Sequence, residues 1–270
     1  MVHKRDYEKD VVYHYCFPRA DTVPNVSPFS LKLETFMRLH NIRYENVYTL
    51  TKRSKHGLLP FVELNGQTIA DSQLIIEKLK TVHNIKEFEN PEEAAVHRAF
   101  QRMIENHTFF VLNKFKILDR IDEMGKAFLK NTDLPKYLKP LAKPILKWKL
   151  VSRAKSRQNA ALGNYSDEDF KMLLKKDLDA FRDFLGEKKY FAGNKITLTD
   201  CSLFGILASA YYLKIENYFK QLIKVDYPTI VAFLENVKQE LWKDDFEKKP
   251  EVVAEAEAEV AEAAAAPKEE

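Results

Sequence analysis

The stretch LPFVELNGQTIADSQLIIEKL, residues 59–79, decides the fold of this chain. Two short apolar runs flank Asn65-Gly66, and both residues of this dipeptide tolerate the positive φ angles of a tight hairpin turn. After Asp71-Ser72, apolar residues recur at helical spacing, at Leu74, Ile75, Ile76 and Leu79. The stretch therefore predicts two short strands joined by a tight turn and followed by a helix.

Upstream of this stretch the pattern predicts a strand, a helix and another strand. Residues Val11–Phe17 are rich in β-branched and aromatic side chains, as in a strand covered on both faces. Pro28 can begin a helix that Ser27 caps, and helical spacing continues to about His40. A second strand fits Arg43–Tyr48. The order is βαβ, then ββα.

After Pro91 the spacing becomes helical throughout. The first of these helical patterns comprises Val96, Ala99, Phe100, Met103, Ile104, His107 and Val111. Further helices are expected within residues 170–185 and 230–241. The fold class is therefore α+β, with a small mixed sheet at residues 8–85 and an all-helical domain at residues 92–246.

Composition points to a folded, water-soluble protein, because 45% of the 270 residues are apolar and 31% are charged. The glycines match neither GxGxxG nor GxxxxGK[ST], which excludes the commonest nucleotide-binding loops. The first ten residues lack the apolar region of a secretory signal, and the longest apolar run, Cys201–Leu213, is too short to span a bilayer. We expect a cytoplasmic protein.

Charge is unevenly distributed along the chain. Residues 247–270 contain eight acids and three lysines in an Ala/Glu-rich run, a net charge of −5, and we expect them to form a disordered tail. Residues 1–246 contain 40 basic and 32 acidic residues, a net charge of +8. The expected folded body is basic.

Two pairs in the opening stretch allow more than one interpretation. Leu59-Pro60 belongs at a strand's start or in a tight turn, and either a trans or a cis bond is compatible with the sequence. Asp71-Ser72 can cap the helix or, with the exposed N–H groups, bind a carboxylate.

Together, these residues resemble the thioredoxin-like half of glutathione transferases, with a proline before a hairpin and an acid-Ser pair before a helix. The resemblance extends to GNKITLTDCSLFG, residues 193–205, where Thr197 and Asp200 form a variant capping box with a structural role. Residues 17–42 and 185–208 resemble the failed-axon-connections and cadmium-responsive branch, which is related to metaxins. The resemblance covers Val11–Trp242.

The resemblance implies that residues 8–85 form a thioredoxin-like glutathione-binding domain, with glutathione as co-substrate. Leu59, beside Pro60, would hold its cysteinyl part, and Asp71 and Ser72 its γ-glutamyl end. A basic loop would meet the glycyl carboxylate; its residues are Lys52, Arg53, Lys55 and His56.

Two residues compete for the role of thiol activator. Ser27 lies in SPFS, which resembles the CPxC or SPxC turn of thioredoxin-like enzymes at a helix N-terminus, with serine at both cysteine positions. Tyr15 resembles the strand-end tyrosine of other transferase classes. Both residues could instead be structural, Ser27 as a cap and Tyr15 as a core residue.

No other catalytic group is expected. Cys16 and Cys201 lie in apolar stretches, where thiols are usually inert packing residues. The histidines form no HExxH pair, and no metal site is predicted.

A basic segment at residues 130–157 carries nine basic side chains against the single acid Asp133, interleaved with leucines and Trp148. Such a segment could lie on an anionic membrane surface or pack its apolar side chains on its own bundle. No nucleic-acid-binding motif is present. A monomer and a homodimer both remain open.

Two functions fit these observations. The first is a glutathione transferase-like protein that activates the glutathione thiol for conjugation or reduction of small electrophiles in detoxification or stress response. The second, suggested by the branch, is a non-catalytic adaptor or membrane-surface protein in axon development or organelle import.

Overall fold

The structure is a computed structural model that describes residues 2–130 and 137–248. The tail predicted for 247–270 therefore lies outside the described residues, apart from its first two. The sheet domain contains β1 (Val12–Cys16), α1 (Pro28–Leu39), β2 (Tyr44–Tyr48), β3 (Phe61–Leu64), β4 (Gln67–Ala70) and α2 (Ser72–Val82). The helical domain contains α3 (Pro91–Met103), η1 (Ile104–Thr108), α4 (Phe109–Asn113), η2 (Lys114–Leu118), α5 (Ile121–Lys130), α6 (Lys139–Ala161), α7 (Asp167–Leu185), α8 (Leu198–Tyr211), α9 (Tyr218–Asp226), α10 (Pro228–Leu241) and η3 (Lys243–Asp245).

The four strands form one mixed sheet in the order β2-β1-β3-β4. The β1 strand pairs parallel with β2 and antiparallel with β3, and β3 pairs antiparallel with β4. This topology confirms the βαβ-ββα order and the α+β class predicted from the sequence. The turn between β3 and β4 also forms as predicted, because Asn65 and Gly66 have φ angles of 49° and 75°.

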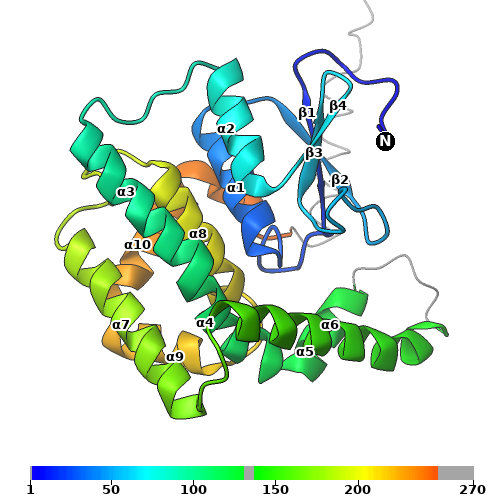
Figure 1. Cartoon of the computed structure of the whole chain (residues 1–270), viewed down its shortest axis with the longest axis vertical. Coiled ribbons are helices and arrows are strands. Elements are labelled where there is room, and N and C mark those ends of the chain that lie inside the picture. The colour runs from blue at the N-terminus through cyan, green and yellow to red at the C-terminus, as the bar shows by residue number, and fades with distance from the viewer. Residues whose placement is uncertain (1, 131–136, 249–270) are drawn as a thin grey trace, which may run out of the picture.

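The two faces of the sheet are covered differently. One face packs against α1 and α2, as Figure 1 shows, and Val12 and Val62 join the main core there with Phe36 and Ile76. The other face carries a small separate cluster of Val11, Tyr13, Tyr15, Phe61 and Ala70. The alternation of side chains along a strand places Tyr15 on this second face, away from α1.

The helical domain is built around α8, in which every residue from Leu198 to Ala210 is buried. The α3 helix continues through η1, α4 and η2, where η1 and η2 have π-helical hydrogen bonding. Such π-helical turns often occur at functional sites, because they redirect the side chains that follow. Beyond residue 85 the described chain contains helices and two isolated β-bridges, at Tyr190–Gly193 and Ala192–Lys195.

The two domains meet where α1 packs against α8 (Figure 1). A Cβ atom at Gly205 would lie 2.7 Å from the Pro28 carbonyl oxygen and 2.8 Å from the Lys32 nitrogen. Only glycine allows the two backbones to approach this closely. The glycine therefore sets the position of the first turn of α1 relative to the helical domain.

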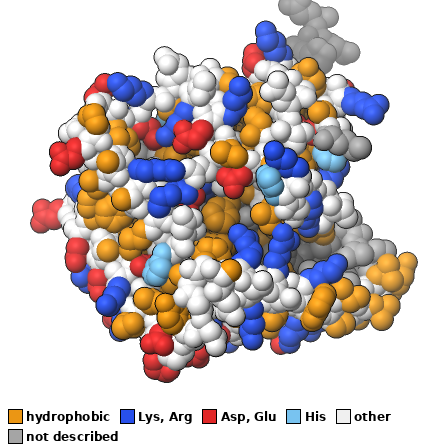
Figure 2. Space-filling model, in the orientation of Figure 1, with side chains coloured by type: hydrophobic (Ala, Val, Ile, Leu, Met, Phe, Trp, Pro, Cys, Tyr) orange, Lys and Arg blue, Asp and Glu red, His pale blue; other side chains and the backbone are white. Residues whose placement is uncertain are grey.

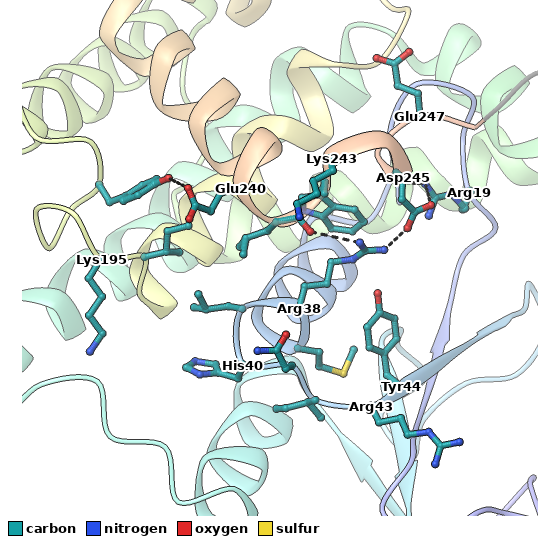
Figure 3. A pocket seen from close by; sticks show the side chains of 18 of the residues that line it. Arg19, Arg38, His40, Arg43, Tyr44, Lys195, Glu240, Lys243, Asp245 and Glu247 are labelled. Atoms are coloured by element: carbon teal, nitrogen blue, oxygen red, sulfur yellow. Dashed lines mark hydrogen bonds and ion pairs between the residues drawn. The ribbon is translucent and has the colours of Figure 1, made fainter.

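The far end of α1 is held by the segment after α10 (Figure 3). The Arg38 guanidinium lies 4.0 Å from the centre of the Trp242 ring and pairs with Asp245. Asp245 also pairs with Arg19 at 3.5 Å. These contacts tie residues 242–245 to α1 and to the segment between β1 and α1.

None of the helices in residues 2–130 and 137–248 combines the length and apolar character needed to cross a membrane. Cys16 and Cys201 are both buried and unpaired by disulfide, and burial raises the pKa of each thiol well above its ordinary value.

The Gly205 contact predicts the effect of adding one methyl group. Gly205→Ala should lower the free energy of unfolding by about 1–3 kcal/mol or more, because backbone atoms of α1 must move. Gly125→Ala is the matched control, since a Cβ at Gly125 meets no atom within 4 Å. Urea denaturation of both variants measures the difference, and equal stability would show that the helices do not meet at Gly205.

Candidate glutathione and co-substrate cavities

A small cavity of about 250 Å³ lies where the sheet domain meets the helical domain. From the sheet domain it is lined by residues before β3 and at the start of α2, including Leu59, Pro60, Asp71 and Ser72. The remaining wall residues include Phe29, Ser54, His56, Gln73, Arg102, Glu105, Asn106, Phe110 and Arg157. Leu59, Pro60, Asp71 and Ser72, which the resemblance predicts to bind glutathione, therefore line one cavity.

The start of α2 presents polar groups to this cavity. Asp71 has a φ of 76° and caps the helix, since its Oδ1 atom accepts the N–H groups of Gln73 and Leu74 at 2.9 and 3.3 Å. Both bonds use Oδ1, so the Oδ2 atom makes no hydrogen bond within the described part of the chain. Ser72 is buried at the first position of the helix. Capping and ligand binding are therefore compatible at this pair.

The Leu59–Pro60 peptide bond is cis, one of the two forms that the sequence left open. Pro60 immediately precedes β3, as its lack of an N–H predicts. Leu59 is half-buried and contributes to the walls of both cavities described here.

A larger cavity of about 540 Å³ adjoins the first and shares Phe29, Leu58, Leu59 and Arg157 with it. Ser27 lines this larger cavity at the N-terminus of α1. Figure 2 shows a hollow between the sheet domain and α6, with hydrophobic side chains inside it and Lys and Arg side chains around it.

The Ser27 hydroxyl is arranged as a hydrogen-bond donor. Its oxygen accepts the Ser30 N–H at 3.5 Å, and its own backbone N–H donates to Asn25 Oδ1 at 2.9 Å. Neither bond uses the hydroxyl proton. Lys116 donates to the carbonyl of Val26, the residue before Ser27, and to the Ser209 hydroxyl, each at 2.9 Å. Burial lowers the pKa of Lys116 to about 7.

Tyr15, the rival candidate, lines neither cavity. Its side chain is buried against Phe61, with ring centres 4.4 Å apart, and its hydroxyl donates to Glu63 at 3.0 Å. Burial and this carboxylate raise the pKa of Tyr15 far above its ordinary value. The Tyr15 hydroxyl therefore already donates its hydrogen bond within the sheet domain.

The basic loop divides its side chains between different environments. His56 lines the smaller cavity and Arg53 the larger one. Lys55 is exposed and lines neither, so of the four loop residues only His56 lines the cavity predicted to hold glutathione.

The helical domain contributes residues to the walls of both cavities, and the sequence did not indicate these contributions. Arg102, Glu105 and Asn106 belong to α3 and η1, whose helical spacing indicated only a packed face. Arg157 was counted within the basic segment, with no indication that α6 returns over the sheet domain. A charged residue inside an apolar helical pattern, such as Glu105, was the only available signal.

Glu105 links the wall of the smaller cavity to both domains. It pairs with Lys32 of α1 at 3.0 Å and with Arg102 at 2.9 Å, and it accepts the Ser202 hydroxyl of α8 at 3.0 Å. Burial opposes ionisation, but the charges of Lys32 and Arg102 outweigh it and lower the pKa of Glu105. Glu105 is therefore an ionised residue that joins α1, η1 and α8.

Thr197 and Asp200 form reciprocal contacts at the start of α8. The Asp200 carboxylate accepts the N–H and the hydroxyl of Thr197, each at 2.8 Å, and the Phe191 N–H at 2.8 Å. Burial raises the pKa of Asp200 to about 6, although these donors oppose the shift. The pair lies in the core, away from both cavities.

Among the described residues, no group of three or more His, Cys, Asp or Glu side chains is arranged to hold a metal ion.

The chain belongs to the glutathione transferase superfamily. Residues 28–121 match the family model for the glutathione S-transferase N-terminal domain, and residues 174–237 match a model for the C-terminal domain. These matches cover α1, the hairpin and α8, but neither Ser27 nor α6.

Three relatives define the similarity further. The chain is 31% identical to Failed axon connections of Drosophila melanogaster over 90% of its own length, and it spans 61% of that protein. It is 24% identical to the isoprene-epoxide glutathione S-transferase of Rhodococcus sp. (strain AD45), covering 84% of this chain and 97% of that one. A Ceriporiopsis subvermispora glutathione S-transferase, solved in complex with glutathione, aligns with a TM-score of 0.56 and 16% identity over 88% of this chain and all of the other.

The similarity to Failed axon connections supports the branch that residues 17–42 and 185–208 indicated. The solved structure shares the fold of this chain at low sequence identity.

The Glu105 network predicts a large loss of stability when its carboxylate is removed. Glu105→Gln should lower the free energy of unfolding by about 3–5 kcal/mol, because Lys32 is left buried without its partner. Adding Lys32→Met should restore part of the loss. Glu123→Gln, at an exposed pair, is the control and should change stability by less than about 0.5 kcal/mol.

The same network predicts a pH dependence. Because the folded-state pKa of Glu105 is lowered, its stabilisation is present above the unfolded pKa and is lost as pH falls through the folded pKa. Urea midpoints measured from neutral to acidic pH should therefore fall less in Glu105→Gln than in the wild type. Parallel profiles would contradict the assignment.

Proposed function

We propose that this chain binds glutathione in the smaller cavity and activates its thiol beside Ser27 for transfer to an electrophile in the larger cavity. The observation that carries the proposal is the adjacency of the two cavities, with Ser27 on one wall and Leu59 shared between them. A thiol held between the cavities would face both the serine hydroxyl and the second substrate.

The smaller cavity suits a zwitterionic peptide end. The Asp71 Oδ2 atom would accept the γ-glutamyl ammonium, while the Ser72 hydroxyl and the start of α2 would donate to the neighbouring carboxylate. His56 lies on the same wall and would meet the second carboxylate. In this arrangement Lys55 is a peripheral residue.

Ser27 would lower the thiol pKa because its hydroxyl would donate a hydrogen bond to the thiolate sulfur and stabilise the ionised form. The position at the N-terminus of α1 adds the favourable end of the helix dipole. The thiolate then attacks the electrophilic carbon and forms the C–S bond, while the bonding electrons of that carbon move to its leaving group or opened ring. Tyr15, bonded to Glu63 outside both cavities, is the weaker candidate.

The names of two similar proteins support the proposal. The Rhodococcus relative is named for an isoprene-epoxide and glutathione, and the Ceriporiopsis structure contains glutathione. Epoxides are small electrophiles of the kind that a thiolate opens.

Calorimetric titration of glutathione into the purified protein tests the binding site. Ser72→Ala should weaken binding about 10- to 100-fold, because one hydrogen bond to a charged group is lost. Thr81→Ala is the control, since it removes an exposed hydroxyl from the other end of α2. Absence of glutathione binding to the wild type at millimolar concentration would overturn the proposal.

Conjugation assays on the same protein distinguish the two activators. Ser27→Ala should lower kcat while leaving glutathione affinity nearly unchanged, because its hydroxyl acts on the thiolate. Tyr15→Phe should leave kcat nearly unchanged. The reverse pattern would assign the role to Tyr15.

A second candidate function is attachment to an anionic membrane surface through α6. The sequence left open whether the apolar side chains of this segment pack on their own bundle. Leu141, Ile145 and Trp148 are instead 69%, 59% and 68% exposed, and their i, i+4, i+7 spacing places them on one stripe. Exposed Lys149 and Lys155 lie on the same helix. An apolar stripe bordered by cations favours the interface of an anionic bilayer.

Flotation with phosphatidylcholine vesicles, with and without phosphatidylserine, tests this second function. The wild type should bind only the anionic vesicles, and Trp148→Ser should reduce the bound fraction because an interfacial anchor is lost. Val225→Ser is the control, since Val225 is 79% exposed on α9, away from the stripe. A wild type that binds neither vesicle at low salt would eliminate this function.

A further inference from the structure

The larger cavity combines an apolar interior with an unusual charge. Its apolar walls come from both domains and include Phe17, Phe29, Leu50, Phe109, Ile117 and Leu150. Its volume of about 540 Å³ lies within the range of small-molecule sites, about 300–1,000 Å³. An occupant must therefore bury substantial hydrocarbon surface.

The charged side chains on this wall are all of one sign. Five basic residues line the cavity and no acidic residue does: Arg53, Lys116, Lys149, Arg153 and Arg157. Within the described part of the chain, no ion pair joins any of these five to a carboxylate. The side chains that line the cavity therefore include basic groups and no carboxylate.

The three arginines are held in place by contacts that leave their charge uncompensated. Arg53 lies over the Phe17 ring at 5.8 Å, and Arg157 lies over the Phe109 ring at 5.9 Å. Arg153 donates to the Gly57 carbonyl at 3.2 Å. Desolvation lowers the pKa of both Arg53 and Arg157, and the positive charge of Arg153 lowers both further. Arg153 is therefore close enough to repel both guanidinium groups.

A separate groove at the C-terminal end of α1 shows that unpaired cations are not a general feature of this basic protein. That groove, of about 1410 Å³, is also rich in arginine, but Glu240, Asp245 and Glu247 share its wall. Figure 3 shows Arg38 bonded to Asp245 there, and Arg43 pairs with Glu8. Its arginines are used to hold the chain together, whereas those of the larger cavity are not.

We infer that the larger cavity selects an amphipathic carboxylate, whose hydrocarbon part lies between Phe29 and Leu150 and whose headgroup meets Arg153 and Arg157. A guanidinium fork matches a carboxylate in geometry, and the apolar floor accepts the chain. This inference rests on the proposed function only in naming the occupant as the co-substrate. The binding itself does not require glutathione.

Calorimetric titrations without glutathione test the inference, using decanoate, 1-decanol and decylammonium as probes with one chain and three headgroups. Decanoate should bind at least about tenfold more tightly than decanol, as one charge-assisted hydrogen bond provides. Decylammonium should bind least, because the cavity carries like charge. Equal affinity for decanoate and decanol would overturn the inference.

Variants locate the headgroup. Arg157→Gln and Arg153→Gln should each weaken decanoate binding about tenfold or more and leave decanol binding unchanged. Arg157 makes no hydrogen bond to another described residue, whereas Arg153 donates to the loop at Gly57, so Arg157→Gln does not release that loop. Lys155→Gln is the matched control, because it removes one positive charge from α6 outside the cavity wall.

Two outcomes separate this inference from the proposed function. If the wild type binds glutathione but does not prefer decanoate to decanol, the inference is overturned and the proposed function stands. Equal weakening in Arg157→Gln and Lys155→Gln would assign the preference to the general positive charge of the protein and overturn the headgroup site.

Discussion

The close contact of α1 with α8 at Gly205 is the constraint on which both cavities depend. The Lys32 nitrogen of α1 lies 2.8 Å from the position that a Cβ atom at Gly205 would occupy, so α1 can hold only one position relative to α8. Lys32 and Glu105 add an ion pair across the same joint, and Arg38 holds the other end of α1. Because Ser27 begins this helix, its position beside the larger cavity follows from packing against a domain that lies far along the chain.

The two π-helical turns relate the helical domain to the cavities. The η1 turn contributes Glu105 and Asn106 to the smaller cavity, and η2 contributes Lys116 and Ile117 to the larger one. A regular helix across these residues would rotate the later side chains to another face, since π-turns insert an extra residue. One interrupted helical run between residues 91 and 118 therefore supplies Glu105 and Asn106 to one cavity and Lys116 and Ile117 to the other.

The local elements were predictable because their causes are local. The Asn65-Gly66 turn needs positive φ angles, Pro28 and Ser27 begin α1, and Asp71 caps α2. These effects act over a few residues and are written in neighbouring positions. Tyr15 was harder to interpret, because the sequence could not show that Glu63, on the neighbouring strand β3, accepts a hydrogen bond from its hydroxyl. A strand-end tyrosine and a buried one have the same local pattern.

The sequence by itself determined the βαβ-ββα order, the helical second domain, the capping residues and the net positive charge of residues 1–246. Only the tertiary structure decided which cations are neutralised. Arg38 and Arg43 meet carboxylates from other parts of the chain, whereas Arg153 and Arg157 face an apolar cavity. The reason is that electrostatic pairing depends on distance in space, and that distance is set by packing between elements rather than by separation along the chain.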